Sequence, residues 1–132
     1  MKPSEMLKTH CIKGIASWSK VLCIFDPDNY AIFDARVARA LNALQIIAGI
    51  EHQEFVRFPT LSSQNKVIKR ADTKINQFFE RQGITIIEEC YAAYVATLKA
   101  AAGNKLKICE VEMRLFSGAE YLSEQAIKKL EP

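Results

Sequence analysis

The residues best placed to do chemistry lie in one short stretch, where an aspartate precedes two arginines. Asp34 follows the mostly apolar residues 30–33 and directly precedes a segment whose apolar residues recur with a helical period. An aspartate at such a position caps the helix, and losing the cap costs about 1 kcal/mol. The same carboxylate, beside Arg36 and Arg39, could stabilise a developing positive charge or align a water molecule. Both roles of Asp34, helix cap and catalytic acid, are open at this level.

A second candidate is a basic stripe on a predicted helix over residues 65–81. Cations gather on one side of its helical wheel, opposite Ile68 and Ile75; they are Lys66, Lys69, Arg70, Lys74 and Arg81. Such a stripe could follow a nucleic-acid backbone, with each phosphate contact adding to a salt-dependent affinity. The alternative is the ordinary solvated face of an amphipathic helix.

Two aromatic residues near Asp34 could stack on a nucleotide base that has been extruded from a duplex. Tyr30 lies four residues before Asp34. Trp18, the only tryptophan, belongs to an apolar face with Ile15, Leu22 and Phe25, which makes it equally a core anchor.

The elements that must position these residues are all predicted to be helices. Capping and turn residues, together with the apolar periodicity, predict helices over residues 15–25, 34–48, 65–81, 85–102, 106–116 and 120–130. A further short helix is predicted near residues 2–11. Residues 26–29 are expected to form a turn, and Gly49 is expected to end the helix that follows it. Thr85 is expected to cap a later helix, and Ser117 and Gly118 are expected to separate the last two, with Phe116 facing inward. The sequence thus predicts an all-α fold, a compact bundle of five to seven helices forming one domain over residues 1–132.

Composition agrees with an ordinary globular protein. The chain of 132 residues is 49% hydrophobic and 25% charged, with a net charge of +3. No signal segment or membrane-spanning run is visible, so we expect a soluble, cytoplasmic, reduced protein. The cysteines show no metal-ligand spacing, so we expect no metal and no cofactor, and each cysteine is interpreted as a small buried apolar residue; they are Cys11, Cys23, Cys90 and Cys109.

Residues 30–42 read YAIFDARVARALN, an apolar run, an aspartate, two variable residues and a helix start with an arginine. This pattern resembles the helix-hairpin-helix DNA glycosylase superfamily, and residues 13–44 look like uncharacterised bacterial domains with an 8-oxoguanine-glycosylase-like fold. The resemblance implies a glycosylase-like helical fold and DNA as partner. It places Asp34 at the catalytic acid and Arg39 at the arginine that follows it.

The hairpin of the family has the form Leu-Pro-Gly-x-Gly, whereas this chain has only Gly14, with Ala16 at the second glycine. No lysine stands at the Schiff-base position, since Lys20 comes several residues too late. The resemblance therefore implies a degenerate or monofunctional base-excision protein. In it, Arg36, Arg39 and the lysine-rich stripe would contact phosphate.

A rival interpretation needs no nucleic acid. Asp34 would only cap its helix, and the protein would be a non-enzymatic, all-helical interaction or regulatory module. Such a module could be a homodimer, with Tyr91, Tyr94 and Phe116 at an interface instead of in a core.

Overall fold

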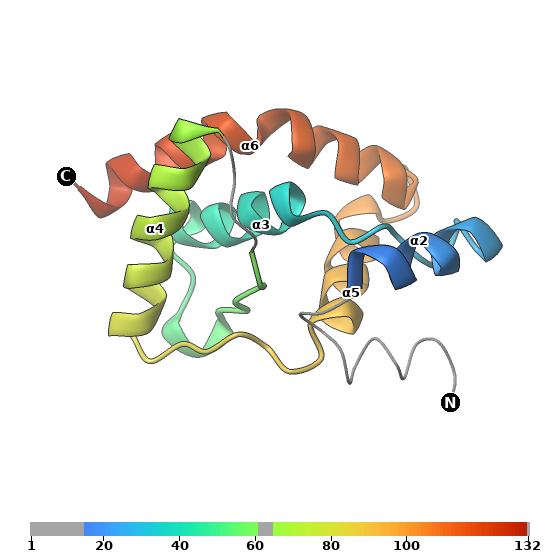
Figure 1. The fold of residues 1–132 in the computed structure, drawn as a ribbon, viewed down its shortest axis with the longest axis horizontal. Helices are drawn as coiled ribbons and strands as arrows, with labels where there is room; N and C mark the ends of the chain where they lie inside the picture. Colours follow the sequence, from blue (N-terminus) through green and yellow to red (C-terminus); the bar gives the residue numbers. More distant parts are fainter. Residues whose placement is uncertain (1–14, 61–64, 132) are drawn as a thin grey trace.

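The computed structural model describes residues 15–60 and 65–131, and over these ranges the fold is all-α (Figure 1). Its five α-helices are α2 (Ile15–Phe25), α3 (Ala35–Ala48), α4 (Lys66–Arg81), α5 (Cys90–Ala102) and α6 (Ile108–Leu130), with a short 3-10 helix at His52–Glu54. The predicted all-α fold with five helices is confirmed. The helix expected near residues 2–11 lies outside the described residues.

The helices α3 and α6 form the centre of the molecule. They run alongside each other, and α4 crosses them at one end while α5 packs against α6 at the other (Figure 1). The helix α2 lies at the α5 end and leads through residues 26–34 into α3. Contacts between residues that are far apart in the sequence therefore converge on α3 and α6.

The buried side chains form two clusters, one toward each end of this central pair. The first gathers around Tyr94 of α5, whose ring lies 4.9 Å from that of Phe33 and 6.3 Å from that of Phe58. The second is built around Phe79 of α4, whose ring contacts that of Phe55 edge-on. Both clusters take residues from α3 and from α6, so these helices belong to two cores at once.

Local signals explain both ends of α3. Asp34 caps its start, because one carboxylate oxygen accepts hydrogen bonds from the backbone N–H of Arg36 at 2.7 Å and of Val37 at 3.3 Å. Gly49 ends the helix at φ +64°, where its N–H donates to the carbonyls of Gln45 and Ile46. Both positions were predicted from residue type alone.

Two predicted boundaries are wrong. Ser117 and Gly118 do not separate two helices, since α6 continues through them for 23 residues. Thr85 does not cap α5, which begins at Cys90. Residues 84–87 are instead irregular, with Ile86 in an isolated bridge with Arg57 and the Ile87 N–H donating to the Arg57 carbonyl at 3.0 Å, and residues 88–89 form a turn before α5.

Two predicted burials are also wrong. Phe25 at the end of α2 is 83% exposed and Phe116 on α6 is 45% exposed. Both lie at helical spacing from apolar neighbours, but no described element covers Phe25, and the ring of Phe116 is only partly covered, by the Arg36 side chain of α3. The inner side of α2 is instead held by the half-buried Trp18 and Leu22 and by Ser19, whose hydroxyl accepts a hydrogen bond from the Phe33 N–H at 2.7 Å.

Candidate functional site

The carboxylate of Asp34 is half-buried and serves the start of α3. It accepts hydrogen bonds from the backbone N–H groups of Arg36 and Val37 in the following turn, as the cap interpretation expects. The side chains of Arg36 and Arg39, which were expected beside it, contact other residues instead. The structure therefore does not gather Asp34, Arg36 and Arg39 into one constellation.

Arg36 reaches across to α6. Its guanidinium lies over the ring of Phe116, 4.8 Å from the ring centroid, and its Nε donates to the Phe116 carbonyl at 3.1 Å. A cation held over an aromatic face in this way is attracted by the ring quadrupole. Arg36 thus fastens α3 to the middle of α6.

Arg39 is buried, with 6% of its surface exposed. Its Nε lies 3.6 Å from a carboxylate oxygen of Asp72 on α4, and Thr60 donates to the same oxygen at 3.0 Å. Burial raises the pKa of Asp72, while Arg39 and Thr60 act in the opposite direction. Arg39 lies in the interface between α3 and α4, and a phosphate group could reach it only if this pair opened.

Two pairs of cations in the basic stripe on α4 have different surroundings. Lys66 and Lys69 are exposed, and neither has an ion-pair partner within the described ranges. Arg70 and Lys74 both pair with Glu131 at the end of α6, and the hydrogen bond from Lys74 lowers the pKa of that carboxyl group. Two of the five cations of the stripe, Arg70 and Lys74, are therefore used to hold α4 against α6.

The two aromatic candidates have different surroundings. Trp18 packs, half-buried, against the core cluster around Tyr94. Tyr30 lines two hollows between residues 23–30 and the last helices. Of the two residues, Tyr30 lines the cavities found among the described residues, so Tyr30 is placed as a stacking role would require.

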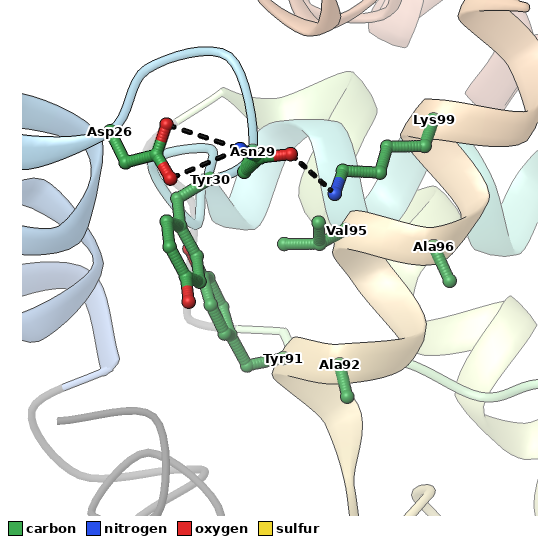
Figure 2. A pocket seen from close by; sticks show the side chains of 8 residues that line it. All are labelled: Asp26, Asn29, Tyr30, Tyr91, Ala92, Val95, Ala96 and Lys99. Carbon is green, nitrogen blue, oxygen red and sulfur yellow. Dashed lines mark hydrogen bonds between the residues drawn. The ribbon is translucent and has the colours of Figure 1, made fainter. Parts of the chain in front are cut away.

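The first hollow, which we call the α5 cavity, has a volume of about 510 Å³ (Figure 2). It is lined by Asp26, Asn29, Tyr30, Tyr91, Ala92, Val95, Ala96 and Lys99. A chain of hydrogen bonds crosses its rim: the Asn29 amide donates to the Asp26 carboxylate at 3.0 and 3.2 Å and accepts from the Lys99 ammonium at 3.2 Å. The turn at residues 26–29 was predicted, but nothing in the sequence pairs it with Lys99, 70 residues later.

The second hollow, the α6 cavity, has a volume of about 560 Å³ and shares Asn29, Tyr30 and Lys99 with the first. Glu112 stands in its wall, where a carboxylate oxygen accepts from the Tyr94 hydroxyl at 2.7 Å. Burial raises the pKa of Glu112, and the nearby negative charge of Asp34 adds to this effect, against the hydrogen bond from Tyr94. Beyond Tyr94, no titratable side chain is hydrogen-bonded to Glu112 in the described part of the chain.

The cysteines differ from expectation. Cys109 is exposed and Cys23 is half-buried, and both are free thiols on the α6 cavity. Cys90 is buried but disulfide-bonded. Disulfides are rare in the reducing cytoplasm, so Cys90 does not support the location expected from the sequence.

Within residues 15–60 and 65–131, no group of three metal-ligating side chains could hold an ion, and no helix has the length and apolar character to cross a membrane. Comparison with protein-family models, with curated proteins and with solved structures finds no match.

Proposed function

We propose that this protein is a non-enzymatic interaction module that binds a second copy of itself through the outer side of α2. The observation that carries the proposal is the exposure of Ile24 and Phe25, which are 78% and 83% exposed at the end of that helix. Exposed, contiguous apolar side chains on a folded domain mark surfaces that another molecule covers.

The pattern of α2 supports this proposal. Its inner side buries part of Trp18 and Leu22 against the body of the protein. Its outer side carries Val21, Ile24 and Phe25, so the helix is apolar on both sides although the described fold covers only one. Apolar side chains on a second side of a helix are normally covered, and this cover must then come from outside the described fold.

The test is the mass of the full chain in solution, measured by light scattering over a range of concentrations. A homodimer has twice the 14.9 kDa mass of the chain. The double variant Ile24→Ser/Phe25→Ser is expected to remain monomeric without loss of fold, because exposed positions cost little when changed. The matched control is Tyr121→Ser, another exposed aromatic residue on the distant half of α6, which should still dimerise. A monomer at every concentration, or a dimer unaffected by the double variant, would contradict the proposal.

A second function is favoured by a separate observation: Lys66 and Lys69 at the start of α4 are exposed and have no ion-pair partner among the described residues. We propose that they contact the phosphate backbone of DNA, the partner that the glycosylase-like sequence pattern implies. Catalysis by Asp34 is not part of this proposal, because that carboxylate caps α3, and Arg39 is buried against Asp72.

Fluorescence anisotropy with duplex DNA at rising salt tests the second function. Binding at about 50 mM salt should weaken steeply as salt increases, and Lys66→Gln/Lys69→Gln should lower the salt slope by about 2. Lys105→Gln, another exposed lysine, is the control. No affinity at low salt removes DNA as a partner and leaves the dimer proposal untouched.

A further inference from the structure

We propose that the α5 cavity binds a small organic anion whose body is aromatic or aliphatic, with its charged group on Lys99. This site is distinct from the outer side of α2 and from the lysines of α4. Its volume of about 510 Å³ lies within the range of small-molecule pockets in proteins.

The walls of the cavity are suited to an apolar ligand body. Tyr30, Tyr91 and Val95 all line the cavity (Figure 2). The Tyr91 hydroxyl is already used, since it donates to the Ala31 carbonyl at 2.7 Å. The ring face of Tyr91 is therefore what this side chain offers to a ligand. Ala92 and Ala96 leave room along α5.

The charge that would hold the anion is the ammonium group of Lys99. Its hydrogen bond goes to the neutral amide oxygen of Asn29, at 3.2 Å, and no carboxylate of the described residues lies within ion-pair distance of it. An ammonium has three donors, so a ligand carboxylate can be added without breaking the bond to Asn29.

Asp26 limits what the ligand can be. Its carboxylate lines the same cavity and is joined to Lys99 only through the Asn29 amide. A ligand with a second negative group near this rim would meet repulsion. The geometry thus favours a monocarboxylate with an apolar body over a multiply charged nucleotide or sugar phosphate.

The experiment is a titration of the full-length protein with 4-phenylbutyrate, followed by ¹H–¹⁵N correlation spectra, in parallel with the neutral amide of the same compound. Shift changes are expected at Tyr30, Val95 and Lys99. The acid should bind about 2–5-fold more tightly than the amide, the factor expected for one partly exposed ion pair. Shifts confined to other regions, or equal affinity for acid and amide, would overturn the proposal.

Two variants separate the charge from the apolar walls. Lys99→Met keeps the aliphatic stem and should remove the preference for the acid while leaving amide binding unchanged. Ala96→Trp, at an exposed position on α5, should fill the cavity and weaken both compounds. Lys105→Met, an exposed lysine outside both cavities, is the control and should bind like the unaltered protein. A Lys99→Met variant that still prefers the acid would also overturn the assignment.

Discussion

At the residue scale, Asp34 is where a catalytic interpretation and a structural one can be separated most directly. Its carboxylate accepts from two backbone N–H groups of α3, so Asp34→Ala should lower the free energy of unfolding by about 1 kcal/mol. Asp34→Asn should cost much less, because asparagine caps a helix nearly as well. Urea unfolding measures both. Asp28→Ala, at an exposed position in the preceding turn, is the control and should change little. An equal loss for Ala and Asn would show that the charge, and not the cap, matters.

Glu112 should make stability depend on pH. Burial raises its folded-state pKa above the ordinary value of 4.5, so the folded protein holds this proton more tightly than the unfolded chain does. Stability from this group is complete below about pH 4.5 and is lost as the pH rises through the folded pKa. Glu112→Gln stays neutral and can still accept from Tyr94.

The measurement is urea unfolding of both proteins at several pH values. The unaltered protein should lose stability relative to Glu112→Gln as the pH rises from about 4 to about 7. A difference that is constant with pH would mean that the Glu112 pKa is the same in the folded and unfolded states.

At the element scale, the sequence was sufficient at both ends of α3, but the local signals at Thr85 and at Ser117 and Gly118 gave wrong boundaries. Asp34 and Gly49 were both predicted as the ends of α3, because capping depends on residues within one turn. The contact of Arg39 with Asp72 and that of Lys99 with Asn29 were missed, since nothing local records which helices meet. Periodicity likewise places Phe25 on an apolar side without telling whether anything covers that side.

Gly118 inside α6 and Gly49 at the end of α3 should respond in opposite ways to substitution by alanine. Gly118 lies inside α6, and a Cβ there would meet only Leu122 Cδ1 at 4.0 Å, an ordinary contact. Gly118→Ala should therefore stabilise the protein by about 0.5–1 kcal/mol, the helix-propensity difference. Gly49 ends α3 at φ +64°, and a Cβ there would lie 3.0 Å from Lys129 Nζ, so Gly49→Ala should destabilise by about 1 kcal/mol. Thermal or urea unfolding of the two variants measures both changes in stability. If both substitutions stabilised the protein, the left-handed cap at Gly49 would be contradicted.

At the scale of the whole molecule, α3 and α6 pass through both core clusters, so the two clusters should unfold together. Trp18 reports on the first cluster, whereas Ile75, 2% exposed, lies in the second. Ile75→Val deletes one buried methyl group and should cost about 0.5–1.5 kcal/mol. Because the coupling runs through shared helices, the Trp18 fluorescence transition should move to lower urea by the same amount as the far-ultraviolet circular dichroism transition. A fluorescence transition that stayed in place while circular dichroism shifted would mean two separately stable units, and the central pair of helices would then not unify the fold.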